Sequence, residues 1–405
     1  MHANPETGSQ NVNSGLAKDR VKRRYLVLGF LVTASAMSAW RFLKNCIKVL
    51  IGRDLYFNEQ GLFLRQYVLH LTGLRPIRKI TCRGHRGEGP GSQALMVMNA
   101  INFAHSFGLT YLHTPFTHIQ HADRPIQEWV TAWEGLFNLG TGEAVCGQER
   151  QEAVNFSHNF HDLDLIFDWH SHNDELADHF KDMIPEFRRK YYLNKSPRTT
   201  EEVTVAVHIR RGYDVPANHS LRTSTNSILR TITQVKGVLD AHRVQHRISV
   251  YSEGNNADFA EICIPGVELS KYRVGHRSEG KNDDIGKVSL PNVESFLHID
   301  AFCAMRELIE ADVLIMSKSS FCYYAALISE GIKILEPITL SGNDYLPGWK
   351  WRRCSPTDRW IPCVADGSFD SVAFERQLFL VVQSKSVAAI NASTGDSDQK
   401  SNDLT

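Results

Sequence analysis

Short, almost entirely apolar runs recur between residues 203 and 335 and alternate with segments of helical periodicity. Three such runs are Val203–Ile209, Val313–Met316 and Ile332–Leu335, each rich in β-branched residues and too short for a typical helix. Strands that read as continuous apolar runs are buried on both faces, whereas half-exposed strands alternate polar and apolar residues. The pattern therefore predicts the α/β class, with a parallel sheet covered by helices on both faces.

The same alternation is present nearer the N-terminus. An apolar run over 77–82, a glycine-rich loop over 84–91, a helical pattern over 92–106 and a second apolar run over 109–112 predict one β-α-β unit. At 405 residues the chain exceeds the usual size of one domain. A polar, turn-forming run over 194–200 separates two regions of this kind. We therefore expect an N-terminal domain over 75–198 and a C-terminal domain over 203–385.

Both ends of the chain are polar and lack periodicity, so residues 1–24 and 386–405 are predicted to be disordered tails. The apolar segment 25–40 follows the basic cluster Lys22-Arg23-Arg24 and precedes Arg41. Its length corresponds to about 24 Å of helix, against a hydrocarbon core of about 30 Å. We interpret it as a marginal signal anchor; a cleaved signal peptide and a buried helix are the alternatives.

Composition excludes several classes of protein. Lys+Arg and Asp+Glu are equal at 45 each, so no overall positive charge favours nucleic acid. The eight cysteines form no CxxC pair, and the His- and Asp-rich stretch 158–174 lacks the spacing of known metal motifs, so no metal site is predicted. Acceptor sequons at Asn155, Asn218 and Asn391 are compatible with a glycoprotein that follows the secretory route.

The most distinctive local feature is the end of the strand predicted at 203–209. His208, Arg210 and Arg211 close this strand, and Gly212 and Asp214 follow. Arginine suits a diphosphate because its planar group donates hydrogen bonds in pairs and stays charged, and glycine lets the backbone approach an anion closely. A solvated surface turn is the alternative interpretation.

These residues resemble the first motif of the α1,2- and α1,6-fucosyltransferases, in which His-x-Arg-Arg is followed closely by an acid. Ile248 to Gly254 resembles the second motif, a strand that ends in a hydroxyl residue and an acid. The stretch from Asp300 through Phe321 and on to Ala326 resembles the third motif and is the longest of the three. The motifs occur in the order found in that family.

The resemblance implies a GT-B fold, with two facing Rossmann-like domains, and an inverting glycosyltransferase that needs no metal or other cofactor. It implies that the C-terminal domain binds a GDP-sugar donor and the N-terminal domain binds a glycan acceptor. Matched to the motifs, the donor-binding residues would be His208, Arg210, Arg211, Glu253, Ser319 and Ser320. Two of these assignments have a simpler alternative: the serines as a helix N-cap, and Glu253 as a turn residue.

One departure from the family concerns the catalytic base, the group that would deprotonate the acceptor. The acid after the arginine pair is displaced by one residue, to Asp214, and the glutamate found a few residues further on in α1,6-type relatives is absent. An inverting transfer needs a group that takes the proton of the acceptor hydroxyl. Asp214 and His219 are the candidate catalytic residues.

The loop over 83–93 does not have dinucleotide-binding spacing, so we expect a hinge or an acceptor-facing loop, with a simple connector as the alternative. The leading functional hypothesis is a fucosyltransferase-like enzyme that uses GDP-fucose. The alternatives are a glycosyltransferase with another nucleotide sugar and a catalytically silent, glycan-binding relative. If the chain is eukaryotic, its anchor would make it a single-pass type II protein of the Golgi or another secretory membrane.

Overall fold

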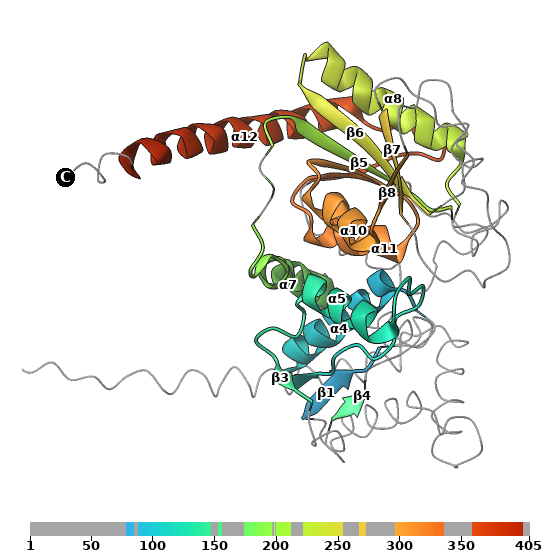
Figure 1. Ribbon diagram of the computed structural model, residues 1–405, viewed down its shortest axis with the longest axis vertical. Helices are drawn as coiled ribbons and strands as arrows, with labels where there is room; N and C mark the ends of the chain where they lie inside the picture. Colours follow the sequence, from blue (N-terminus) through green and yellow to red (C-terminus); the bar gives the residue numbers. More distant parts are fainter. Residues whose placement is uncertain are drawn as a thin grey trace, which may run out of the picture.

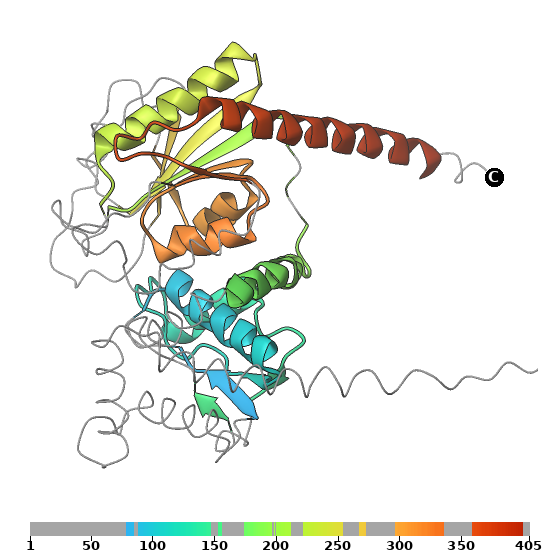
Figure 2. The same ribbon diagram turned by 180° about the vertical axis from the view of Figure 1, so that it is seen from behind.

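The computed structural model contains two parallel β-sheets separated by layers of helices (Figures 1 and 2). The structure describes residues 78–84, 88–146, 153–155, 174–196, 198, 200–211, 222–253, 267–272, 296–335 and 359–399. All strand pairs within both sheets are parallel in this part of the chain. The predicted α/β class and its parallel sheets are confirmed.

Sheet A is built from the N-terminal region in the order β3-β2-β1-β4. Its strands are β1 (Lys79–Cys82), β2 (Thr110–His113), β3 (Ala144–Val145) and β4 (Val154–Asn155). Its helices are α4 (Pro90–Phe107), α5 (Ile126–Phe137) and α7 (Asp174–Tyr192). The predicted β-α-β unit is therefore present as β1, α4 and β2. Gly108 ends α4 with φ 62°, a left-handed conformation that glycine adopts without steric cost.

Sheet B has the order β11-β10-β9-β5-β6-β7-β8. Its strands are β5 (Val203–Ile209), β6 (His246–Ser252), β7 (Val267–Tyr272), β8 (Phe296–Ile299), β9 (Val313–Met316), β10 (Ile332–Leu335) and β11 (Trp360–Pro362). Its helices are α8 (Thr225–Ala241), α10 (Ala301–Glu310), α11 (Ser320–Ile328) and α12 (Ser371–Gln399).

The direction of strand addition in sheet B reverses between β5 and β9. The chain adds β6, β7 and β8 on one side of β5, and then returns to place β9, β10 and β11 on the other side. In open parallel sheets, ligands bind outside the carboxyl ends of the strands at such a switch point. The topology therefore predicts a ligand site at the carboxyl ends of β5 and β9.

Two hydrophobic cores cover the two faces of sheet B. On the outer face, β5, β6, β9 and β10 pack against α8 and α12. The inner face packs on α10 and α11, and the same cluster continues through α4, α5 and α7 to β1 and β2 of sheet A. Figure 1 shows this order of layers, with α10 and α11 between sheet B and the helices of sheet A. One continuous core thus joins the two sheets, and the predicted domain division at 198–203 stays a prediction.

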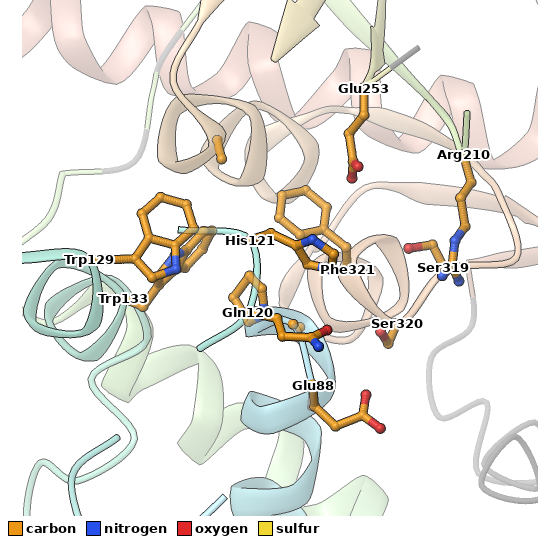
Figure 3. A pocket seen from close by; sticks show the side chains of 14 residues that line it. Glu88, Gln120, His121, Trp129, Trp133, Arg210, Glu253, Ser319, Ser320 and Phe321 are labelled. Carbon is orange, nitrogen blue, oxygen red and sulfur yellow. The ribbon is translucent and has the colours of Figure 1, made fainter. Parts of the chain in front are cut away.

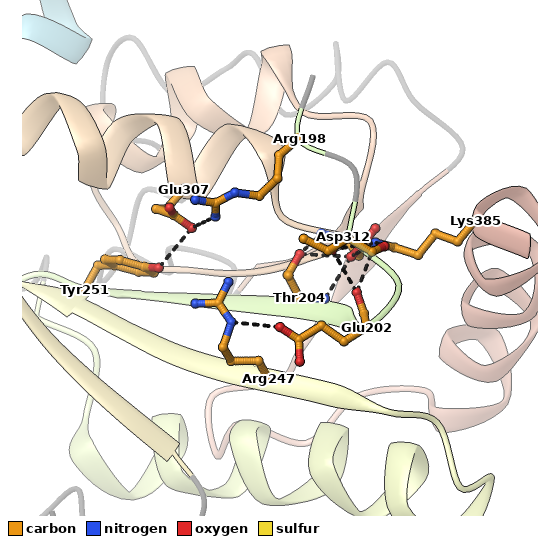
Figure 4. A network of polar contacts seen from close by, with 9 residues as sticks. Arg198, Glu202, Thr204, Arg247, Tyr251, Glu307, Asp312 and Lys385 are labelled. Atoms are coloured by element: carbon orange, nitrogen blue, oxygen red, sulfur yellow. Dashed lines mark hydrogen bonds and ion pairs between the residues drawn. The ribbon is translucent and has the colours of Figure 1, made fainter. Parts of the chain in front are cut away.

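Polar contacts fix the chain where it enters sheet B (Figure 4). Asp312 Oδ2 accepts hydrogen bonds from the N–H and hydroxyl of Thr204 at 2.8 and 2.9 Å, and it pairs with Lys385 of α12 at 2.9 Å. Lys385 also donates to the carbonyl of Glu202, whose carboxylate pairs with Arg247 of β6. These contacts connect the segment before β5, strands β5 and β6, and helix α12. They lie at the end of sheet B opposite to the carboxyl ends of its strands.

Two further expectations concern the parts of the chain outside the sheets. The anchor segment 25–40 lies outside the described residues, and within those residues no helix has the length and apolarity needed to cross a membrane. Helix α12 runs to Gln399 and so occupies residues 386–399, which composition assigned to a disordered tail. A helix that has already formed gains one hydrogen bond for each residue added, and 386–399 contain no proline to stop it.

One predicted glycosylation acceptor lies inside the fold. Asn155 belongs to β4 and is buried, and its Oδ1 accepts a hydrogen bond from Arg83 N at 3.1 Å. A glycan needs an exposed asparagine amide, so this sequon is not available in the folded chain. Asn218 lies outside the described residues.

Candidate functional site

A pocket of about 240 Å³ opens at the carboxyl ends of β5 and β6 (Figure 3). From sheet B and its helices it is lined by Arg210, Glu253, Ala301, Ser319, Ser320 and Phe321. From the sheet A side it is lined by Glu88, Gly89, Pro90, Gly91, Gln120, His121, Trp129 and Trp133. The pocket thus lies at the switch point of sheet B and is closed by the N-terminal region.

Alternation along β5 separates the two arginines of the first motif. Side chains of a strand point to opposite faces in turn. Ala206 packs on the inner core with α10 and α11, whereas Ile209 packs on the outer core with α8. Arg210 continues the inner series and lines the pocket, where its guanidinium donates to Lys318 O at 3.4 Å. Arg211 continues the outer series.

Arg211 is therefore turned away from the pocket. Its guanidinium is buried and donates to Thr223 O at 2.8 Å and to Thr225 Oγ1, at the start of α8, at 3.5 Å. It also donates to the carbonyl of Arg210 at 3.0 Å. The structure thus brings Arg210, and not Arg211, to the wall of the pocket, and Arg211 fastens the segment that leads into α8.

His208 lies beneath the pocket. Its side chain is buried, its Nδ1 shares a hydrogen bond of 2.5 Å with Ser317 Oγ, and its ring stacks on Phe321 with 5.7 Å between centroids. Burial, together with the charge of Arg210, lowers the pKa of His208 from 6.5 to about 3. The imidazole is therefore neutral at physiological pH and supports Phe321 and Ser317 from below.

The start of α11 forms the second part of the pocket wall. Ser319 is the N-cap residue: its carbonyl accepts from Tyr323 N at 2.9 Å, while its hydroxyl makes no capping bond to the helix. Ser319 and Ser320 both line the pocket. The first N–H groups of a helix have no acceptor within the helix and carry a partial positive charge. With Arg210 beside them, they form a site suited to a phosphate or another anion.

Glu253 follows β6 directly and lines the pocket. Figure 3 shows its carboxylate reaching into the pocket from the side of sheet B. Asp300, which opens the third motif, has a different place. It is the N-cap of α10, where its Oδ1 accepts from Phe302 N at 2.8 Å, and its other oxygen pairs with Arg124. Asp300 therefore caps α10.

Close packing brings the starts of α4 and α11 together. A Cβ atom on Gly91 would lie 2.5 Å from Phe321 Cα, so only glycine fits at this position. Gln93 holds the adjoining loops, because its Nε2 donates to Glu88 O at 2.9 Å and to His118 O at 2.8 Å. Residues 88–91 of the glycine-rich loop therefore pack against the start of α11 and line the pocket.

An aromatic cluster completes the wall on the sheet A side. Trp133 of α5 packs on Phe302 of α10 with 4.3 Å between centroids, and Trp129 lies 5.1 Å from the same ring. Both tryptophans are fully buried. The sequence analysis did not single out this wall, although the spacing of the two tryptophans places them on one face of a helix. Its position next to the pocket depends on contacts between distant parts of the chain.

Several residues that the sequence analysis considered lie outside the described part of the chain. Asp214 and His219 fall in the segment 212–221, which lies outside the described residues. The histidines and aspartates of 158–172 lie outside them too. Within the described part of the chain, no group of three or more His, Cys, Asp or Glu side chains is arranged to hold a metal ion.

Comparison with solved structures finds distant similarity to fucosyltransferases. The structure of POFUT1 in complex with GDP aligns over 62% of this chain and 94% of its own, with 13% identity and a TM-score of 0.29. NodZ alpha-1,6-fucosyltransferase soaked with GDP-fucose aligns over 62% and 92%, with 12% identity and a TM-score of 0.26. At these values no function follows from the similarity. No protein-family profile and no curated protein matches the sequence.

Proposed function

We propose that this chain is an inverting glycosyltransferase of the GT-B type that transfers fucose from GDP-fucose to a hydroxyl of a glycan. One observation carries the proposal: Arg210 and the start of α11, which belong to the first and third motifs, meet in one pocket at the switch point of sheet B. The motifs lie about a hundred residues apart in the chain. Their meeting is what a common ligand requires.

The chemistry of the pocket fits a diphosphate leaving group. Negative charge grows on GDP as the bond between the sugar and the phosphate breaks. A positioned guanidinium and helix N–H groups stabilise this charge more strongly in the transition state than in the ground state. Arg210, Ser319 and Ser320 supply these groups, and Glu253 would accept hydrogen bonds from the ribose or the base. His208 acts indirectly, by holding Phe321 and Ser317 in place.

The remaining parts of the proposal rest on the sequence. Asp214 and His219 are candidates for the group that deprotonates the acceptor. Transfer without a metal and location in a secretory-pathway membrane, with 25–40 as the anchor, belong to the same proposal. Fucose is favoured by the motif resemblance alone, because the groups lining the phosphate end of the pocket recognise a diphosphate and not a hexose.

Arg210→Ala tests the proposed diphosphate site. Loss of a hydrogen-bonded charge costs about 1.5–3 kcal/mol, so we expect GDP to bind about 10- to 100-fold more weakly, as measured by isothermal titration calorimetry on the full chain. Arg230→Ala is the matched control, because Arg230 is exposed on α8 and pairs with Asp366. GDP affinity within twofold of wild type in the Arg210 variant would contradict the assignment.

Turnover distinguishes the proposed enzyme from its alternatives. The chain is incubated with GDP- and UDP-sugars and with β-galactoside or N-glycan acceptors, with and without EDTA, and released nucleotide is measured. The proposal predicts release from GDP-fucose in EDTA. Release from another nucleotide sugar identifies a different donor, and GDP binding without any turnover identifies a silent relative.

A further inference from the structure

His121 has an unusual backbone conformation on the wall of the pocket. Its φ is 66°, in the left-handed region, which non-glycine residues adopt rarely and at some energetic cost. It is one of the pocket-lining residues and is half-buried. Such conformations persist only where the surrounding structure enforces them, and they concentrate at functional sites.

The loop around His121 is held at several points. Gln120 N donates to Glu88 O at 3.1 Å, and Gln93 connects Glu88 O with His118 O. The imidazole itself lies against Gly89, where an added Cβ would be 3.6 Å from Cδ2 of His121. The ring is thus set in place by the start of α4 as well as by its own loop.

The position of the ring suits proton transfer. In Figure 3 the imidazole of His121 lies between the tryptophans and the group formed by Arg210, Ser319 and Ser320. His121 belongs to the sheet A side of the pocket, whereas the anion-binding groups belong to sheet B. In an inverting transfer, the acceptor attacks the sugar from the face opposite to the leaving phosphate. The base must therefore come from a different wall of the pocket than the phosphate-binding groups, and His121 belongs to the wall formed by the sheet A side.

We infer that His121, in place of the sequence candidates Asp214 and His219, is the catalytic base of the proposed transfer, an inference that rests on the proposed function. One ring nitrogen of the neutral imidazole accepts the proton of the acceptor hydroxyl as its oxygen forms a bond to the anomeric carbon. The bond from that carbon to the β-phosphate oxygen breaks, and its electron pair leaves with GDP, whose diphosphate Arg210 would hold. The imidazolium then returns the proton to solvent. Imidazole suits this exchange because it titrates near neutral pH.

Charged groups of both signs line the pocket together with His121. Glu88 and Glu253 are acidic, and Arg210 is basic. On its own loop, Arg124 is neutralised by ion pairs with Asp123 and with Asp300 of α10. A base must be unprotonated to act, so we expect transfer to decline as the pH falls.

The test uses His121→Asn, because asparagine tolerates the left-handed conformation but cannot act as a base at neutral pH. His121→Gly is a second variant with the same tolerance, and His105→Asn, on the exposed end of α4, is the matched control. GDP binding, circular dichroism and GDP release from GDP-fucose, with water or a glycan as the acceptor, are measured for each. Release is followed from pH 5 to 9.

Loss of the base should reduce kcat by about 10²- to 10⁴-fold in both His121 variants, while GDP affinity and the fold are unchanged. In wild type kcat/KM should fall as the pH is lowered and the base becomes protonated, and this decline should be absent from the residual activity of His121→Asn. Activity of the His121 variants within threefold of wild type would overturn the inference. So would a decline of kcat/KM at low pH in His121→Asn that matches the decline in wild type. Transfer that is lost in Glu88→Gln but retained in His121→Asn would also overturn it, because Glu88 would then be the base. A wild-type chain that binds no GDP overturns the proposed function itself.

Discussion

Neighbouring residues at the end of β5 have different tasks because a strand points its side chains alternately to its two faces. Arg210 reaches the pocket, while Arg211 is buried against the segment that starts α8. His208, on the same face as Arg210, is buried one step deeper. A motif that reads as one basic cluster in the sequence thus divides into a pocket-lining arginine, a buried arginine that holds the start of α8, and a buried histidine.

Arg211→Met should lower the free energy of unfolding more than Arg210→Met does. Methionine keeps much of the apolar stem but leaves the carbonyl of Thr223 without its buried donor, at a cost of about 1–3 kcal/mol. Arg210 is partly exposed, and its replacement should change stability by no more than about 0.5 kcal/mol. Urea unfolding of the two variants measures the difference, and equal losses would mean that Arg211 has no structural role.

His208 should make the protein less stable in acid. The folded state keeps this imidazole neutral down to about pH 3, whereas the unfolded chain protonates it near pH 6.5. Stability from this residue is therefore complete above pH 6.5 and is lost as the pH falls toward 3, by up to about 1.4 kcal/mol per pH unit.

Replacing the imidazole should remove that contribution. Unfolding free energies at pH 7, 6 and 5 should vary less in His208→Asn than in wild type, and His105→Asn, an exposed control, should keep the wild-type dependence. An identical pH dependence in His208→Asn would show that the buried imidazole is not the group that titrates.

At the scale of elements, the pocket depends on how closely the starts of α4 and α11 approach each other. Gly91 permits this contact because it has no Cβ to meet the backbone of Phe321. The approach places Glu88 and Gly89 opposite the serines of α11. The spacing of two helix ends, and not any single side chain, thus sets the width of the pocket.

Gly91→Ala should destabilise the fold by about 1–3 kcal/mol and weaken GDP binding, because the added methyl group pushes α4 away from α11. Gly237→Ala in α8 is the control: nothing lies within 4 Å of its added Cβ, and alanine there should raise stability by about 0.5–1 kcal/mol. Thermal unfolding and calorimetry with GDP check both variants. Wild-type stability and affinity in Gly91→Ala would contradict the proposed packing.

Local patterns were sufficient to predict most elements around the site. The apolar runs at β5, β9 and β10 and the helical periodicity of α8 are properties of short segments, and the structure contains all of these elements. The aromatic wall, His121 and the burial of Arg211 were not predicted, because they depend on contacts between residues far apart in the chain. For the burial of Arg211, the only local signal was the alternation of side chains along β5.

At the scale of the whole molecule, one hydrophobic cluster runs from sheet A through α4, α5 and α7 to the inner face of sheet B. Arg188 of α7 strengthens this junction by donating to the carbonyls of Ile328 and Ser329, at the end of α11, at 2.9 and 2.7 Å. The pocket takes one wall from each side of the junction. A shared core therefore holds the proposed phosphate site and the proposed base in fixed relation.

A crystal structure of the chain with GDP is the most direct test of the proposed donor site. It should place the diphosphate oxygens within hydrogen-bond distance of the Arg210 guanidinium and of the N–H groups in the first turn of α11. Arg211 should keep its bond to the carbonyl of Thr223. A diphosphate bound elsewhere, or one that contacts neither Arg210 nor the start of α11, would contradict the assignment of this pocket.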